Sequence, residues 1–282
     1  MAEDPHWPRA ANWLSDSGLA DFGLLGVPAH LTSISPTRAD TTPDAVREAL
    51  APLLHLRQRL RSCEVSAVDL GNIADPDSPA GEDRTRAAVA GFAGRLLVAL
   101  GGDNSITTAV AQGAAATGLI TLDAHHDLRD GASNGSPVRR LIEGGLPGER
   151  VVQIGIADFA NSAYYAARAR DYGITVITRQ EVAVRGIADV MAEALEIAGP
   201  RVHVDLDVDV CDRSVVPACP ASAPGGLSAY ELRQAARLAG AAPGVVSMDL
   251  TEVDAAADAP DGRTVRLVAL CVLEAAAGLM SR

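Results

Sequence analysis

The sequence predicts an α/β protein built around a largely parallel β-sheet, and two observations support this. Short apolar or β-branched runs recur along the 282 residues, and segments of helical periodicity lie between most of them. This alternation implies right-handed crossovers between parallel strands. Aromatic residues make up only 3% of the chain, so the core must be built from Val, Leu, Ile and Ala. Such a core suits helices packed closely on a parallel sheet.

Eight strands are predicted in chain order. Each is a run rich in Val, Ile or Leu that is bounded by polar residues, Gly or Pro, which is the composition expected of a buried strand. They are Phe22–Ala29, Glu64–Leu70, Leu96–Gly101, Leu119–His125, Val151–Ile156, Ile174–Thr178, Val202–Val210 and Val245–Thr251.

Helical periodicity between these runs predicts helices at Pro43–Leu60, Ser105–Thr117, Val184–Ala198 and Leu267–Met280. Two stretches are predicted to be exposed loops because they are rich in turn-forming residues; they are Asn72–Glu82 and Pro217–Gly226. The chain shows no interdomain linker and no internal repeat. We therefore expect an N-terminal extension over residues 1–20 and a single domain over residues 21–282.

The charge of the chain excludes several functions. The formal net charge is −12, and all 24 basic residues are arginine. Without lysine, the chain can use neither Schiff-base chemistry nor a lysine general base, and it has no phosphate-binding loop of the GK[ST] type. Its acidity also disfavours binding to nucleic acids and to anionic membranes.

The sequence predicts a cytoplasmic protein. Residues Met1–Asn12 lack the features of a secretory signal, and no apolar run approaches the roughly 20 residues of a membrane span. The four cysteines form no CxxC pair, which argues against a disulfide framework and against a structural zinc site. They are Cys63, Cys211, Cys219 and Cys271.

Acidic residues and histidines gather where four of the predicted strands end. The segments are GGDNS at residues 101–105, DAHHDLRD at 123–130, HVDLDVDVCD at 203–212 and SMDLTEVD at 247–254. A single Asp at a strand end often only caps the next helix. Four such segments on four strands, however, would meet at one edge of a parallel sheet, where ligands bind.

The residues in these segments predict a centre for divalent cations. Alternate strand residues share a face, which groups Asp123 with His125 and Asp127, and Asp205 with Asp207 and Asp209. Carboxylates packed together cannot all stay ionised without positive charge, and there is no lysine to supply it. A carboxylate-rich site with one imidazole suits Mn²⁺ better than Zn²⁺ or Ca²⁺. Two such ions could hold a water and lower its pKa. The same alternation turns His126 away, in a structural role.

Taken together, the four segments resemble the ureohydrolase family of arginases, agmatinases and formimidoylglutamases. The resemblance runs from about Gly23 to Ala276 and includes Gly26-Val27-Pro28 and the helix start at Thr42–Arg47. It implies a three-layer α/β/α sandwich on an eight-stranded sheet, a small-molecule amidino or guanidino acid as substrate, two Mn²⁺ per chain and a homo-oligomer, either a trimer or a hexamer.

Residue by residue, the resemblance implies the following roles. Asp123 and Asp207 match carboxylates that bridge both ions. His125 and Asp209 match ligands of one ion, and Asp127 matches a ligand of the other ion and a partner of the attacking hydroxide. Glu252 matches the acid that orients the cationic substrate group. Asp127 and Glu252 are therefore the expected catalytic residues.

Two positions depart from the family pattern. Asn104 stands where a metal-binding His is expected, and because an amide oxygen is a weaker donor than imidazole, we expect one ion to be labile. Asn134 stands where arginases and agmatinases carry a proton-shuttling His, so the proton must come from Glu252, from another group or from solvent.

Arg129 follows the metal ligand Asp127 by two residues and is suited to bidentate recognition of a substrate carboxylate, although a solvated surface arginine is the alternative. This spacing and the segment Asn134–Pro137 resemble formimidoylglutamases most. Further substrate contacts are expected from Asn134, Ser136, Arg139 and Asn161.

Three functions remain open. The first is hydrolysis of N-formimidoyl-L-glutamate to L-glutamate and formamide, as in histidine degradation. The second is hydrolysis of agmatine or a guanidino acid. The third is a metal-poor relative without catalysis, which the two His-to-Asn departures make conceivable.

Overall fold

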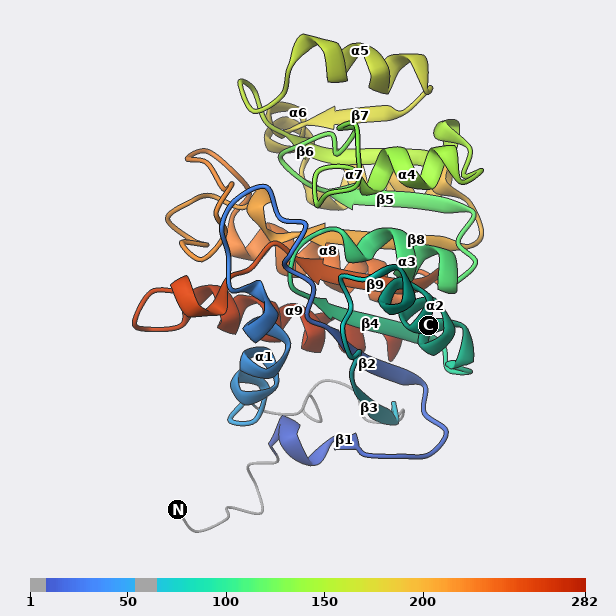
Figure 1. Cartoon of the computed structure of the whole chain (residues 1–282), viewed down its shortest axis with the longest axis vertical. Coiled ribbons are helices and arrows are strands. Elements are labelled where there is room, and N and C mark those ends of the chain that lie inside the picture. Colours follow the sequence, from blue (N-terminus) through green and yellow to red (C-terminus); the bar gives the residue numbers. More distant parts are fainter. Residues whose placement is uncertain (1–8, 54–64) are drawn as a thin grey trace.

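The computed structural model describes residues 9–53 and 65–282. Nine strands of this part form one parallel sheet, in the order β1-β3-β2-β4-β9-β8-β5-β6-β7 (Figure 1). Their bounds are β1 Leu14–Ser15, β2 Phe22–Val27, β3 Ala67–Asn72, β4 Leu96–Gly101, β5 Gly118–Leu122, β6 Val151–Ile156, β7 Thr175–Thr178, β8 Val202–Asp207 and β9 Val245–Thr251.

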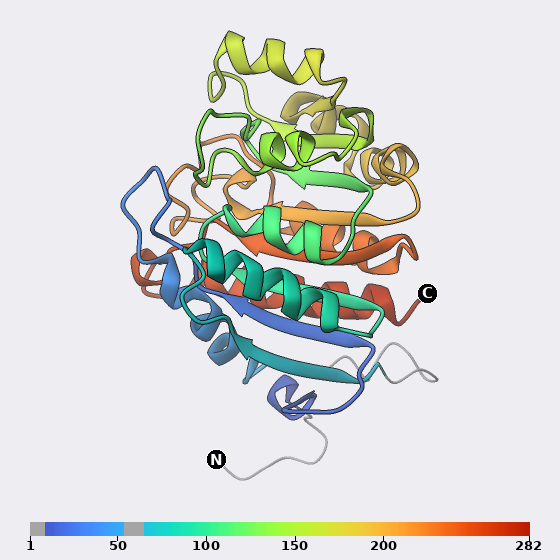
Figure 2. The same ribbon diagram turned by 45° about the vertical axis from the view of Figure 1, so that its right-hand side comes forward.

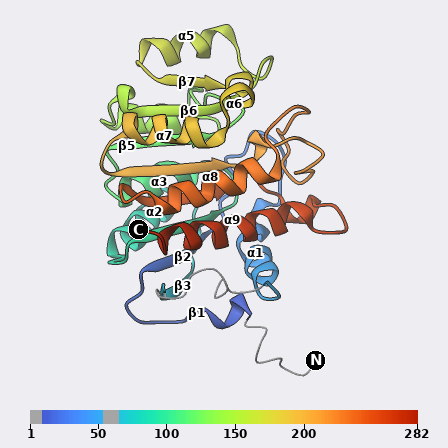
Figure 3. The same cartoon turned by 180° about the vertical axis from the view of Figure 1, so that it is seen from behind.

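Helices cover both faces of the sheet, which confirms the predicted α/β/α sandwich. Helices α2, α3 and α4 cover the face that is in front in Figure 1, and α7, α8 and α9 cover the opposite face, seen in Figure 3. The α-helices are α1 Thr42–Leu50, α2 Pro79–Gly91, α3 Ile106–Gly113, α4 Pro137–Glu143, α5 Ala163–Asp171, α6 Arg179–Arg185, α7 Ile187–Ala198, α8 Ala229–Ala241 and α9 Arg263–Leu279. No helix in the described ranges is long and apolar enough to span a membrane.

The hydrophobic core divides along the sheet because alternate strand residues face opposite layers. Leu96, Val98 and Leu100 of β4 pack in the larger cluster, together with residues of α8 and α9. The intervening Leu97 and Ala99 pack in a second cluster with residues of α2 and α3. Every residue of β4 is buried, as expected for a central strand with helices on both faces.

All eight predicted strands are present, and the ninth is the two-residue strand β1. It pairs with β3 through Leu14 and Ser15, and the indole Nε1 of Trp13 donates to the carbonyl of Val65 over 2.9 Å. Part of the predicted N-terminal extension therefore contacts the sheet edge. The domain boundary at residue 20 stays a prediction, and residues 1–8 and Cys63 lie outside the described residues.

Several predicted bounds were wrong. Helix α2 begins at Pro79, inside the predicted loop, because Ser78 caps it by accepting from the Gly81 amide and because proline suits a first helical turn. The predicted helix Val184–Ala198 is interrupted at Gly186, whose φ of 84° separates α6 from α7. The part of the helix predicted at 54–60 lies outside the described residues.

The segment Pro217–Gly226 was predicted to be exposed and is partly buried instead. Ala218, Cys219 and Ser222 are buried, and the Arg213 guanidinium donates to the carbonyl of Cys219 over 2.6 Å. The loop folds back on the protein because its small apolar residues cover the end of the core. Cys211, Cys219 and Cys271 are buried free thiols, in agreement with the prediction that these cysteines form no disulfide framework.

Candidate metal centre and active site

The sequence segments rich in Asp and His meet at the carboxyl edge of the sheet. Strands β4, β9, β8 and β5 lie side by side in its middle, and their carboxyl ends all point to the left in Figure 2. The turns after β4, β9 and β5 carry Asn104, Glu252 and Asp123, and Asp207 is the last residue of β8. The parallel topology thus brings together residues that are far apart in the chain.

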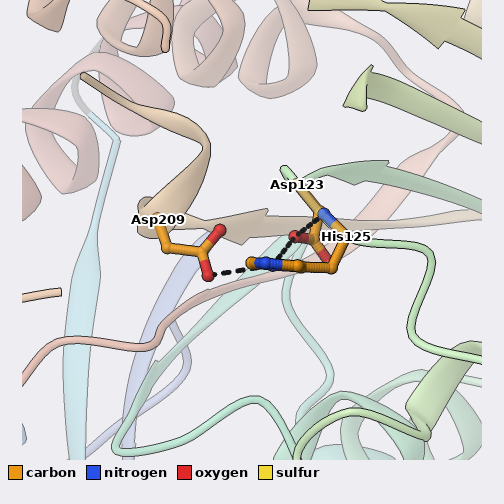
Figure 4. Close-up of side chains that lie close together, drawn as sticks. All are labelled: Asp123, His125 and Asp209. Carbon is orange, nitrogen blue, oxygen red and sulfur yellow. Dashed lines mark hydrogen bonds and ion pairs between the residues drawn. The ribbon is translucent and has the colours of Figure 1, made fainter. Parts of the chain in front are cut away.

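One group of side chains that could hold a metal ion consists of Asp123, His125 and Asp209 (Figure 4). The imidazole Nδ1 of His125 lies 3.2 Å from Asp209 Oδ2 and 3.4 Å from Asp123 Oδ1. The three ligand atoms lie within 4.8 Å of one another. We call this group the imidazole subsite.

A second group that could hold a metal ion consists of Asp123, Asp127 and Asp207, whose carboxylate oxygens also lie within 4.8 Å of one another. All three residues are buried. Asp123 belongs to both groups, whereas Asp207, which was also expected to bridge, falls only in this one. We call this group the carboxylate subsite.

The electrostatics of the two subsites fit divalent cations. Burial raises the pKa of Asp123 to about 6, and burial together with neighbouring carboxylates raises the pKa values of Asp127 and Asp207 well above their usual range. Burial lowers the pKa of His125, but hydrogen bonds with Asp123 and Asp209 outweigh it and raise the pKa to about 12. The chain therefore needs positive charge here. Asp123 Oδ2 and Asp209 Oδ1 are buried with no hydrogen-bond partner in the described structure, so each can ligate a cation.

Asn104, a predicted metal ligand, turns its amide nitrogen toward the carboxylate subsite. Nδ2 donates to Asp127 Oδ2 over 2.7 Å. The amide oxygen instead accepts from the hydroxyls of Thr107, over 2.7 Å, and Thr251, over 3.1 Å. In this orientation Asn104 supports the ligand Asp127 and offers no oxygen to a cation.

Glu252, predicted to be catalytic, lines the cavity beside the two subsites. Its Oε1 accepts from the Asn104 amide over 2.7 Å and from Asn134 Nδ2 over 2.8 Å, and no described residue donates to Oε2. Burial, with the charges of Asp103 and Asp209, raises the pKa of Glu252 to about 8. Its φ of 62° is strained for a residue with a side chain, a feature often found at functional sites.

The predicted substrate contacts divide into two groups. Arg129, Asn134 and Asn161 line a cavity of about 220 Å³ that opens over the metal subsites. Ser136 and Arg139 do not. The Ser136 hydroxyl donates to the carbonyl of Ser133, and the guanidinium of Arg139 donates to the carbonyl of Arg129 in the preceding loop. We correct the expectation for these two side chains, which are already engaged within the protein.

The amides of the two asparagines in the cavity wall are also engaged. Asn134 accepts from the Ile34 amide through Oδ1, over 3.0 Å. Asn161 accepts from the His126 amide over 2.9 Å and donates to the Ala124 carbonyl over 2.9 Å. Arg129 differs: its guanidinium forms no hydrogen bond or ion pair with any described residue. The imidazole of His126 bonds Gln153 over 2.7 Å, although His126, which was predicted to turn away from the site, also lines the cavity.

Several residues that hold the site residues in place were not predicted from the sequence. Thr107 and Thr251 fix the orientation of Asn104, and Arg168 binds the loop that carries Arg129. Asp205 lies 3.5 Å from Asn104 Nδ2 and belongs to neither of the two subsites. The alternation of residues along the strand had indicated Asp205. No sequence pattern near Thr107, Thr251 or Arg168 indicates that these residues support the site.

Known proteins are similar to this one over nearly the whole chain. The arginase family model matches residues 20–278. A formimidoylglutamase from Halalkalibacterium halodurans is 35% identical over 84% of this chain and 81% of its own. A guanidinopropionase from Pseudomonas aeruginosa is 30% identical over 92% of this chain and 88% of its own. The crystal structure of formimidoylglutamase from Bacillus subtilis superimposes with a TM-score of 0.92 at 29% identity, covering 99% of this chain and 94% of that one. The chain belongs to the arginase family.

Proposed function

We propose that this protein is a metal-dependent amidine hydrolase that converts N-formimidoyl-L-glutamate and water into L-glutamate and formamide. The observation that carries the proposal is one cavity lined both by Arg129 and by residues of the two carboxylate-rich subsites. The Arg129 guanidinium has no partner among the described residues. Such a site can hold an amidinium at one end and a carboxylate at the other. The relatives named formimidoylglutamase support the same substrate.

The metal ligands we propose are Asp123, His125 and Asp209 in the imidazole subsite, and Asp123, Asp127 and Asp207 in the carboxylate subsite. We propose two Mn²⁺ per chain, because two groups of ligands share Asp123. The ion in the carboxylate subsite is the labile one, since Asn104 supplies no imidazole there. Bound divalent cations provide the lowered water pKa that hydrolysis at neutral pH requires.

Glu252 is positioned to hold the substrate amidinium. Two amide donors occupy its Oε1, which leaves Oε2 as the acceptor for an N–H of the substrate. A carboxylate is the natural partner of a planar cation with parallel N–H groups. Hydrolysis breaks the bond between the formimidoyl carbon and the glutamate nitrogen, and this nitrogen must gain a proton. Asn134 has no proton to give, so we assign the transfer to Glu252 or to solvent.

Arg129 is positioned to bind a substrate carboxylate. A guanidinium suits this role because its N–H groups match the two carboxylate oxygens. The alternative is that Arg129 is only a solvated surface arginine, and the KM of a variant without its side chain distinguishes the two roles. An Arg129→Ala variant should raise the KM for N-formimidoyl-L-glutamate by about tenfold or more, the loss expected for a charged hydrogen bond, with kcat little changed.

The decisive test of the function is turnover by the protein loaded with Mn²⁺. We expect release of glutamate and formamide from N-formimidoyl-L-glutamate, and little hydrolysis of agmatine or 3-guanidinopropionate. Clear turnover of a guanidino compound alone would contradict the proposed substrate, but it would still support a metal-dependent hydrolase.

The second candidate is therefore hydrolysis of a guanidino acid, which the similarity to a guanidinopropionase favours. This substrate class also pairs a planar cation with a carboxylate, so both substrates would use Glu252 and Arg129. The third candidate, a relative without metal or catalysis, requires that purified protein bind no Mn²⁺ when Mn²⁺ is added. We further propose a cytoplasmic homo-oligomer, a trimer or a hexamer, which sedimentation of the purified protein would test.

A further inference from the structure

The loop that presents Arg129 to the cavity lies between two other arginines, one on each side. Arg139 belongs to α4, which follows this loop, and Arg168 belongs to α5, which lies beyond β6 in the chain. Both side chains are largely buried, with 12% and 18% of their surface exposed, whereas Arg129 is exposed.

Arg168 holds the loop from the side of α5. Its guanidinium donates to the Leu128 carbonyl over 2.7 Å and to Asp130 Oδ1 over 2.8 Å, the residues directly before and after Arg129. It also donates to the Tyr164 hydroxyl over 2.8 Å. The rings of Tyr164 and Tyr165 lie 5.0 and 5.5 Å from its central carbon, so the guanidinium is held in place by stacking as well.

Arg139 holds the same loop from the side of α4. Its Nε donates to the carbonyl of Arg129 itself over 2.6 Å, and another nitrogen donates to the carbonyl of Gly131. The remaining nitrogen pairs with Glu143. The Arg129 amide donates to the Gly135 carbonyl over 2.9 Å, so both backbone groups of Arg129 have partners.

Two of the three arginines are paired with a carboxylate, and Arg129 is not. Arg168 is offset by Asp130 and Arg139 by Glu143. Among the described residues that line the cavity, Arg129 is the only arginine, and its guanidinium has no partner in the described structure. In a chain of net charge −12, one uncompensated cation at the cavity wall is what an anionic substrate needs.

We propose that Arg168 and Arg139 are positioning residues that fix the backbone on both sides of Arg129 and thereby set the affinity for an acidic substrate. The inference rests on the proposed function, because it takes Arg129 as the residue that binds the substrate carboxylate. A loop fixed before binding loses less conformational entropy when the substrate binds. Both arginines act through Arg129 and touch no substrate.

Double-variant kinetics test this proposal directly. Arg168→Ala should raise the KM for N-formimidoyl-L-glutamate several-fold with kcat little changed, in the same direction as Arg129→Ala. The double variant R129A/R168A should show the KM of R129A alone, because Arg168 has nothing left to position. Arg168→Lys, which keeps the charge and loses the planar fork, should lie between wild type and R168A. Arg170→Ala, an exposed position on the same helix, is the matched control.

Three results would overturn the proposal. The KM could stay at the wild-type value in R168A, the effects of R129A and R168A could multiply in the double variant, or R168A could lower kcat alone. Multiplied effects would mean that Arg168 acts on the substrate or on the fold independently of Arg129.

A second measurement does not depend on turnover and covers a variant that folds poorly. Hydrogen exchange of the segment 127–136 should be faster in R168K and in Arg139→Lys than in wild type and R170A. Unchanged exchange would contradict the positioning role. If wild-type protein loaded with Mn²⁺ hydrolyses no N-formimidoyl-L-glutamate while the exchange behaves as expected, the proposed substrate fails and the positioning role stands.

Discussion

The two proposed metal subsites share Asp123 but differ in their remaining residues. The imidazole subsite has a nitrogen donor and a carboxylate oxygen of Asp209 with no other partner. The carboxylate subsite has only acidic ligands, and its neighbour Asn104 turns a nitrogen toward it. We expect buried negative charge to attract a cation to both groups, and the type of donor atom to decide how firmly and how selectively each cation is held.

The largest effect on both subsites is expected from removal of the side chain that they share. Asp123→Asn should abolish binding at both subsites, and activity should fall by more than the about 10–100-fold typical of residues that merely support metal ligands. Metal analysis and turnover of N-formimidoyl-L-glutamate measure both effects. Asp171→Asn, at an exposed position, is the control. A D123N protein that still bound two Mn²⁺ per chain would contradict the shared role.

Removing the imidazole should disable one subsite selectively. His125→Asn should lower the number of tightly bound Mn²⁺ by one per chain and reduce kcat by more than about tenfold. The adjacent His126→Asn is the matched control, because the His126 ring bonds Gln153; its Mn²⁺ stoichiometry should match that of wild type. Equal losses in the two variants would mean that His125 is no ligand.

Adding an imidazole should make the two subsites more alike. Asn104→His should raise the affinity of the weaker Mn²⁺ by about tenfold or more, by analogy with the change in affinity that a single supporting residue can produce, and leave the stronger one nearly unchanged. Equilibrium titration of the metal-free protein with Mn²⁺ checks this. An unaltered weak affinity would mean that residue 104 does not border the labile ion.

The smallest expected effect is on the stability of the metal-free protein. The raised pKa values of Glu252, to about 8, and of His125, to about 12, mean that the folded chain keeps protons that the unfolded chain releases. The free energy of unfolding therefore falls as the pH rises. One such group lowers the free energy of unfolding by about 2 kcal/mol between about pH 6 and 8. This loss corresponds to a Tm that is lower by roughly 4–8 °C.

Thermal unfolding with a chelator and with Mn²⁺ tests this expectation. Mn²⁺ should stabilise the protein more at the higher pH, because the cation replaces the protons that are lost there. A Tm of the chelated protein that rises over this range would contradict the assignment of the buried charges.

The convergence of the ligands could be predicted from the sequence, although the reason for it could not. Alternation along a strand was expected to group Asp123 with His125 and Asp127, but β5 ends at Leu122. The turn that follows, with Asp127 at a φ of 51°, brings the ligands together instead. Likewise β8 ends at Asp207, and Asp209 lies in the short 3₁₀ helix Val208–Val210. Turn conformations depend on contacts that a strand pattern does not contain.

The fold, in contrast, could be predicted because its strands are recognised from their own sequence and not from their contacts. Strands buried on both faces are continuous apolar runs, so each run marks a strand without knowledge of its neighbours. The role of Arg139 was not predictable, because proximity in sequence to Arg129 suggested the cavity, while helix α4 aims its side chain at the carbonyls of the loop. Arginine has several donors, and only the fold decides which acceptors they meet.

The unequal binding of two metal ions is measured most simply by titrating the metal-free protein with Mn²⁺ and following formamide release from N-formimidoyl-L-glutamate in the same samples. We expect two ions per chain that bind with unequal affinity, and activity that rises as the second ion binds. Turnover without metal, a single bound ion at full activity, or two ions of equal affinity would contradict this expectation.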